Sequence, residues 1–153
     1  MATVFSTQRT NARANPVVNN KTNEIGGRVR IAHGVYEASS LASGDVIEMF
    51  KLPNGARIIS GSLAHDALGS STTQSVGHAA YVNSAGTAVA ADADEFKAAA
   101  ASTSAQKVDI AATLALGSGI EIDANEDGYI VTATMGGAAG TGTIEVTMLY
   151  ALD

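Results

Sequence analysis

Residues 44–63 read GDVIEMFKLPNGARIISGSL and contain two runs in which successive side chains point to opposite faces of an extended chain. Apolar side chains recur with a period of two, which is typical of a β-strand, so we expect strands at residues 46–51 and 56–63. Residues 52–55, LPNG, have the composition of a tight turn, because proline fixes its own φ angle and the Asn-Gly pair tolerates the conformations that follow. The sequence therefore predicts a central β-hairpin around which the rest of the chain packs.

Further strands are expected on both sides of this hairpin. The apolar or alternating runs are Arg28–Tyr36, Gln74–Val82, Lys107–Leu116, Ile120–Asp123, Tyr129–Met135 and Ile144–Leu152. The last two alternate most clearly, and the glycine-rich residues 136–142 between them predict a second hairpin.

Residues 92–101, DADEFKAAAA, differ from the rest of the chain. Asp92 is a favourable N-cap, Glu95 stands three positions later as in a capping box, and alanines follow. We therefore expect one short helix here.

Together these patterns give about eight short strands, turns rich in glycine and no alternation of strands with long helices. The fold class that fits is mainly β: an antiparallel β-sandwich, jelly-roll-like, with an extended N-terminal arm and one short helix. We expect residues 1–26 to form the arm and residues 27–153 to form the β-sandwich domain.

The first 26 residues are polar, lack periodicity and are interrupted by Pro16. Such a segment is mobile alone and becomes ordered along another surface, so we expect it to contact another chain. Arg9, Arg13 and Lys21 are the candidates for binding an acidic partner. The charge distribution agrees, since residues 1–57 carry seven Lys or Arg against four Asp or Glu, whereas residues 58–153 carry two against eleven.

Hydrophobic residues make up 46% of the chain, but many are alanine, and only 5% of all residues are aromatic. A core of small side chains gains little free energy per residue, so self-association would be a natural source of further stability. The chain has no cysteine and therefore no disulfide or thiolate metal site. Because neither an export signal nor a membrane-length apolar run is recognisable, we expect a soluble protein with no membrane partner.

The reactive residue types indicate no catalytic centre. His33, His65 and His78 are widely separated and belong to no metal-binding or nucleophile motif. No glycine-rich loop has the strand and helix context of a phosphate site. The basic residues are few and not interleaved with aromatic ones, which argues against nucleic acid binding. We expect no enzymatic activity and no cofactor.

Residues 123–128, DANEDG, match the first half of a calcium-binding loop, with Asp123, Asn125 and Asp127 as candidate oxygen ligands. The bidentate glutamate that closes such a loop is replaced by Thr134, and the flanking residues predict strands rather than helices. A hairpin loop uses the same residue types, because Asn, Asp and Gly tolerate a positive φ angle. We favour a turn without a metal, and calcium binding stays open.

Several segments together resemble the small virion structural proteins of tailed bacteriophages, which include capsid decoration, or cement, proteins. The segments are Gly27–Arg30, Gly44–Glu48, Lys51–Arg57, Ser75–Gly77 and Gly142–Tyr150. The resemblance implies a β-sandwich or jelly-roll body, assembly as dimers or trimers, and no enzymatic activity. It also implies synthesis in the bacterial host cytoplasm and attachment to the major capsid protein on the outer capsid surface.

Two other functions stay open. One is a different role in the same particle, as the base of a head fibre or as a tail protein. The other is a carbohydrate-binding β-sandwich that uses residues 123–128 for calcium. Sugar sites usually present exposed aromatic side chains, and this chain has no Trp and only four Tyr, which counts against the second.

Overall fold

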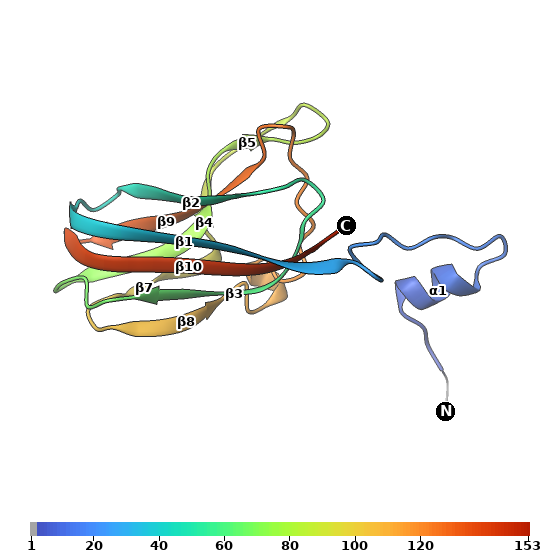
Figure 1. Ribbon diagram of the computed structural model, residues 1–153, viewed down its shortest axis with the longest axis horizontal. Helices are drawn as coiled ribbons and strands as arrows, with labels where there is room; N and C mark the ends of the chain where they lie inside the picture. Colours follow the sequence, from blue (N-terminus) through green and yellow to red (C-terminus); the bar gives the residue numbers. More distant parts are fainter. Residues whose placement is uncertain (1–2) are drawn as a thin grey trace.

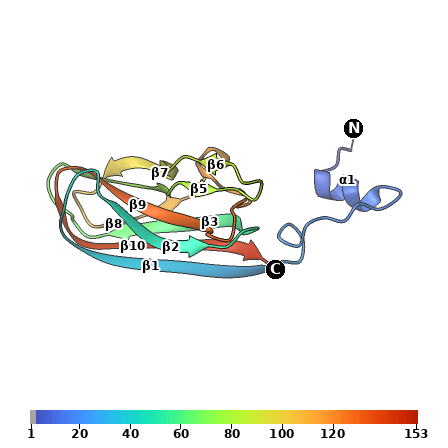
Figure 2. The same ribbon diagram turned by 90° about the horizontal axis from the view of Figure 1, so that it is seen from above.

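A computed structural model describes residues 3–153, in which two four-stranded antiparallel sheets pack face to face (Figures 1 and 2). The strands of the first sheet are, in order, β1 (Arg28–Leu41), β10 (Gly140–Leu152), β3 (Arg57–His65) and β8 (Gln106–Ile110). Those of the second sheet are β2 (Val46–Leu52), β9 (Tyr129–Gly137), β4 (Thr72–His78) and β7 (Asp92–Ala101). The remaining elements are the paired strands β5 (Tyr81–Val82) and β6 (Ala88–Val89), the helix α1 (Thr7–Arg13) and one 3-10 turn, η1 (Leu114–Leu116).

Consecutive strands of the sandwich mostly belong to opposite sheets. The chain passes from β1 in the first sheet to β2 in the second and back to β3 in the first. The last two strands insert between earlier ones, β9 between β2 and β4, and β10 between β1 and β3. Sheets connected in this order form a jelly roll, so the predicted mainly β, sandwich-like fold class is confirmed.

The central hairpin prediction is wrong, although both of its strands exist. β2 pairs with β9, whereas β3 pairs with β10 and β8, so the two strands lie in different sheets. The predicted turn forms between them, with the Ala56 amide donating to the Pro53 carbonyl over 3.3 Å. Alternation of side chains identifies a strand but not its partner, and here the turn carries the chain from one sheet to the other.

The faces predicted for these strands are also shifted. β2 has one extra residue at Met49 and β3 one at Ile59, relative to their partners. Such β-bulges reverse the alternation that follows them. This is why Ile58 and Leu63 are both completely buried although they are five positions apart, which in a regular strand would place them on opposite faces.

The second predicted hairpin is wrong for the same reason. β9 belongs to the second sheet and β10 to the first, and residues 138 and 139 join them. The glycine at position 140 is required by packing, because a Cβ atom there would lie 2.5 Å from the Met135 methyl group. The glycine-rich segment is therefore a closely packed connection from one sheet to the other.

The helix predicted at residues 92–101 is the strand β7, at the edge of the second sheet. Pairing with β4 and the complete burial of Phe96 outweigh the helical preference of the alanines. The capping tendency of Asp92 survives locally, since its carboxylate accepts a hydrogen bond from the Asp94 amide (3.0 Å). A helix occurs in the arm instead, where the Ser6 hydroxyl caps α1 by accepting from the Arg9 amide (3.2 Å).

The other predicted strands differ in extent. The first runs through Gly34 to Leu41, and the run Gln74–Val82 is divided between β4 and β5. The run Lys107–Leu116 ends as a strand at Ile110, and Ile120–Asp123 contributes a single bridge, between Glu121 and Arg57.

The core lies between the two sheets, with Phe96 as its largest fully buried side chain. Leu, Ile, Val and Met from both sheets surround it: Leu52, Ile58, Leu63, Val76, Ile110, Ile122, Val131, Met135, Ile144, Val146 and Met148. At one edge, Gly34 of β1 allows the sheets to meet closely, because a Cβ there would lie 2.6 Å from the Met49 carbonyl oxygen. No helix within residues 3–153 combines the length and the apolar character needed to cross a membrane.

Candidate functional site

The arm extends away from the sandwich at the end where β1 begins and β10 finishes (Figures 1 and 2). Residues 21–24 attach it to the body, and we call this segment the arm anchor. The Lys21 ammonium lies 2.8 Å from both carboxylate oxygens of Glu121. The Thr22 hydroxyl donates to Asp153 Oδ2 (2.9 Å), and the Asn23 amide donates to the Gly55 carbonyl (2.7 Å).

Arg57 joins the arm anchor to the strand below it. Its Nη2 contacts Glu121 Oε2 at 2.9 Å and Glu24 Oε1 at 3.4 Å, while its Nη1 donates to the Gly119 carbonyl at 2.7 Å. The pKa of Glu121 is held below its ordinary value, chiefly by the hydrogen bond from Lys21, with a smaller contribution from the charge of Arg57. Partial burial of the carboxyl opposes this shift. Lys21, predicted to bind a partner, is thus engaged within its own chain.

The two arginines of α1 have different surroundings. The Arg13 guanidinium lies over the Phe5 ring, 4.6 Å from its centroid. Arg9 is exposed and forms no ion pair with any of residues 3–153. No residue of α1 is buried, so the described part of the chain leaves the helix uncovered. The structure does not test whether Arg9, Arg13 or Lys21 binds another chain, and this stays a prediction.

The outer face of the first sheet carries an exposed apolar surface. Ile31 of β1 stands directly opposite Leu149 of β10, so the two side chains share a face. Val29 and Val35 lie on the same face of β1 because residues two apart on a strand point the same way. All four are exposed, and we call them the apolar stripe.

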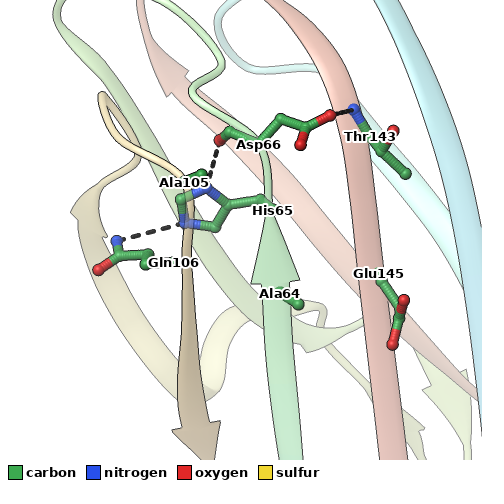
Figure 3. Close-up of a pocket in the computed structure, with 7 residues that line it drawn as sticks. All are labelled: Ala64, His65, Asp66, Ala105, Gln106, Thr143 and Glu145. Atoms are coloured by element: carbon green, nitrogen blue, oxygen red, sulfur yellow. Dashed lines mark hydrogen bonds between the residues drawn. The ribbon is translucent and has the colours of Figure 1, made fainter.

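A hollow of about 310 Å³ at the far end of the sandwich contains His65 and Asp66 (Figure 3). His65 Nδ1 lies 2.7 Å from the Asp66 backbone carbonyl, and its Nε2 lies 3.3 Å from the side-chain nitrogen of Gln106. Nδ1 therefore carries the proton and Nε2 accepts. The Asp66 carboxylate accepts from the Thr143 amide (3.0 Å), which keeps its pKa below the ordinary value. The His65 imidazole and the Asp66 carboxylate thus bond to different partners and not to each other.

The other two histidines also have defined partners. His33 Nδ1 lies 2.9 Å from the Thr147 hydroxyl on the outer face of the first sheet. His78 Nδ1 lies 2.9 Å from the Ala79 carbonyl, and its ring packs against Tyr81 and Tyr129. Within residues 3–153 the structure does not gather three His, Asp or Glu side chains into a metal-binding group.

The loop of residues 123–128 has the hydrogen bonds of a turn. Asn125 Oδ1 accepts from the Asp127 amide (3.0 Å), and Asn125 Nδ2 donates to Asp127 Oδ2 (3.2 Å). Asp123 instead accepts from the Ser84 amide (3.2 Å), and the Lys51 ammonium donates to the Glu126 carbonyl (3.0 Å). A cation thus already neighbours the loop, and Thr134 lies inside β9, paired with Val46 and Ser75.

Sequence reasoning missed Arg57 and Glu121, which hold the arm, and the contact among His78, Tyr81 and Tyr129. Arg57 and Glu121 are 64 positions apart, so no spacing rule brings them together. The only signal in the sequence is that one residue is basic and the other acidic. Many other pairs in the chain have the same property. The strand order is needed to select the right one.

No model of a known protein family and no curated protein sequence match this chain at a significant level. Solved structures with a similar fold are found in phage capsids. A chain in the capsid asymmetric unit of cyanophage Pam1 is 20% identical, has a TM-score of 0.59, and the match covers 100% of both chains. In the capsid of Ralstonia phage GP4 a chain is 22% identical with a TM-score of 0.62, over 83% of this chain and 86% of that one.

A chain in the capsid of Helicobacter pylori bacteriophage KHP30 also matches, with 17% identity and a TM-score of 0.51 over 81% of this chain and 87% of that one. Identities this low establish a common fold. At the level of fold they confirm the resemblance to structural proteins of phage virions that the sequence suggested, and the Pam1 match spans the whole chain.

Proposed function

We propose that this protein is a non-enzymatic structural component of a tailed-phage virion: a capsid decoration, or cement, protein that binds the outside of the head. In this proposal it contacts the major capsid protein, associates with itself as a dimer or trimer, and stabilises the head through these contacts. The observation that carries the proposal is the match to a chain of the Pam1 capsid over the full length of both proteins. A match that leaves out no part of either chain is what two proteins with the same place in a particle would give.

Two surfaces of the chain support a role in assembly. The apolar stripe is formed by four exposed aliphatic side chains on a flat sheet face, and exposed patches of this kind mark contacts between proteins. The arm presents the uncovered helix α1 and, on either side of it, the exposed apolar residues Val4 and Val17. A projecting segment with basic and apolar side chains is suited to lie along the acidic surface of another subunit.

The surroundings of the histidines favour a structural protein over an enzyme. Both ring nitrogens of His65 are occupied by fixed partners, and Asp66 directs its carboxylate at the Thr143 amide. A general base needs a ring nitrogen free to reach a substrate proton, and His65 does not offer one.

The test is the copy number of this chain relative to the major capsid protein in purified particles. A decoration protein should be present at a fixed ratio set by the capsid lattice, and antibody labelling should cover the head. Particles that lack it should release their genome at a lower temperature, and adding the purified chain should restore their stability. A few copies per particle, with label on the tail or at a fibre base, would exclude decoration and favour the other virion role.

Deletion of residues 3–19 tests the arm within the same system. The deletion leaves the arm anchor in place, so the body keeps its intramolecular contacts. We expect binding to particles to weaken and to lose its dependence on salt, because the arm supplies Arg9 and Arg13. Unchanged binding would show that the arm is not a capsid contact.

A further inference from the structure

A second hollow, of about 460 Å³, lies beside the arm anchor. One wall is aromatic: the His78 ring lies 4.8 Å from that of Tyr129 and 5.4 Å from that of Tyr81, and the two tyrosine rings are 5.0 Å apart. Four carboxylates also line the hollow, those of Asp92, Glu95, Glu121 and Asp123, and the remaining lining residues are Val, Ala and Ile. No Lys or Arg is among the residues that line it.

Tyr129 is the most informative residue of this wall. Only 4% of the residue is exposed, but its hydroxyl oxygen is not among the fully enclosed polar atoms without a partner, and it forms no hydrogen bond within residues 3–153. Since Tyr129 lines the hollow, a group that binds there can form a hydrogen bond with this hydroxyl.

The electrostatic field in the hollow is negative. The pKa of the Tyr129 hydroxyl is raised strongly, first by burial and then by the charge of Glu95. The pKa of Tyr81 is raised by burial and by the charges of Asp123 and Glu95. These carboxylates therefore act on the aromatic wall, as they would on any group that bound against it.

The chemistry of the lining selects a cation. Aromatic faces attract a guanidinium or an ammonium group, and carboxylates pair with it at the rim. A planar guanidinium fits best, because it stacks on a ring and donates several hydrogen bonds in one plane, including one to an unpaired tyrosine hydroxyl.

The arm supplies such a group. Residues 1–26 carry three basic residues against one acidic, whereas residues 27–153 carry six against fourteen. Arg13 stacks on Phe5, and Lys21 already pairs with Glu121 on the rim of this hollow. Arg9 is exposed and free of an ion pair with any of residues 3–153, and α1 extends away from its own body (Figures 1 and 2).

We propose that the hollow lined by Tyr81, Tyr129 and Glu95 binds the guanidinium group of Arg9 from the arm of a second copy of this chain. This deepens the proposed function, on which it rests, by naming the contact that joins one subunit to the next. The arm anchor fixes the start of each arm at the edge of its own hollow, and α1 crosses to the neighbouring body.

The test uses full-length chains and a synthetic peptide of residues 3–20 as the probe. In the full-length chain with Arg9→Gln, no arm can fill the hollow of a neighbouring copy, so the hollow is free to bind the wild-type peptide. Binding is monitored through the NMR signals of Tyr81 and Tyr129. A peptide that carries Arg9→Gln should bind about tenfold or more weakly, whereas Arg13→Gln in the peptide should change binding little. Equal losses from the two substitutions would show nonspecific charge attraction and would overturn the proposal.

Two changes in the hollow complete the test. Tyr129→Phe removes only the unpaired hydroxyl, so it should weaken peptide binding without lowering the melting temperature. Glu95→Gln should weaken self-association of the full chain, measured by sedimentation, and combining it with Arg9→Gln should cause no further loss. Glu48→Gln, on the exposed face of β2, is the matched control and should have no effect.

Three results would contradict the proposal: additive losses from Arg9→Gln and Glu95→Gln, occupation of the hollow that does not depend on protein concentration, or an oligosaccharide that competes for Tyr129. The second would assign the hollow to the chain's own arm and the third to a sugar. These measurements need no virion. A negative peptide result would therefore not affect the copy-number test of the proposed function. A negative copy-number result would likewise not affect the peptide measurements.

Discussion

Arg57 Nη2 and Glu121 Oε2 lie 2.9 Å apart and place a strand of the first sheet in contact with the segment that leads to β9. Glu121 also accepts two hydrogen bonds from Lys21. The same carboxylate therefore binds a residue of the body and a residue of the arm. Two of the four backbone hydrogen bonds around this contact join Ile58 to Ile120 (2.9 Å) and Ile122 to Ala56 (2.8 Å), which makes the body side rigid. The arm is therefore attached to a fixed point.

The arm anchor should loosen when Glu121 loses its charge. Glu121→Gln should speed amide hydrogen exchange in residues 21–24 while lowering global stability by about 1 kcal/mol or less, because these ion pairs are partly exposed. Glu126→Gln is the control, since that carboxylate forms no ion pair with residues 3–153. Exchange rates that are the same in both variants would show that the ion pairs do not hold the arm.

The same contact should respond to acid. The pKa of Glu121 is lower in the folded chain than its ordinary value of 4.5, so its ionised form stabilises the anchor. This contribution is complete above pH 4.5 and is lost as the pH falls through the lowered value. Protection of residues 21–24 from exchange should therefore fall in acid in the native chain, and Glu121→Gln should remove this part of the pH dependence.

Gly117 and Gly119 form a matched pair for testing the packing of Phe96. Both have positive φ angles, +76° and +79°, so an alanine at either position is strained by about 1–2 kcal/mol. A Cβ at position 117 would lie 2.7 Å from the Phe96 ring, whereas position 119 has no atom within 4 Å. Gly117→Ala should therefore lower the free energy of unfolding more than Gly119→Ala, in urea titrations. Equal losses would place the ring elsewhere.

Calcium should not stabilise the chain through residues 123–128. Asn125 and Asp127 bond to each other, and Asp123 bonds to Ser84, so the three candidate ligands do not converge. The melting temperature should be the same in calcium and in chelator, and the combined change of Asp123 and Asp127 to Asn should leave it unaltered. A large rise in calcium that this double substitution abolishes would establish a metal site.

Association should raise the thermal stability of the folded chain. A partner that binds only the folded state adds to its stability by mass action, and the apolar stripe and the arm are uncovered in the single chain. The melting temperature should therefore increase with protein concentration and be higher on the capsid than in free solution. A melting temperature that is independent of both would contradict self-association and capsid binding together.

The positions of strands could be predicted from the sequence, but their partners could not. Alternation correctly located β2, β3, β9 and β10, because one face of each is buried in the core. The same pattern arises whether a turn joins two strands of one sheet or strands of opposite sheets. The glycines show the difference only in three dimensions: Gly140 is needed because Met135 packs against it, not because the turn is a hairpin.

Local preference misled the interpretation of residues 92–101. Alanine and an N-cap aspartate favour a helix over short range, while the partner that decides the outcome, β4, lies about twenty positions earlier in the chain. Phe96, completely buried, is the anchor of this strand. The aromatic hollow likewise could not be predicted from the sequence, because the contact between Tyr81 and Tyr129 depends on the order of β4, β7 and β9 in the sheet.

The late insertion of β9 and β10 also governs how the protein is made. Until residues 129–152 have left the ribosome, β1 and β3 lack the strand that lies between them, and so do β2 and β4. Until then both sheets have open edges, which can pair with the edges of other nascent chains. Neither sheet of the sandwich can therefore be completed before residues 129–152 have been made.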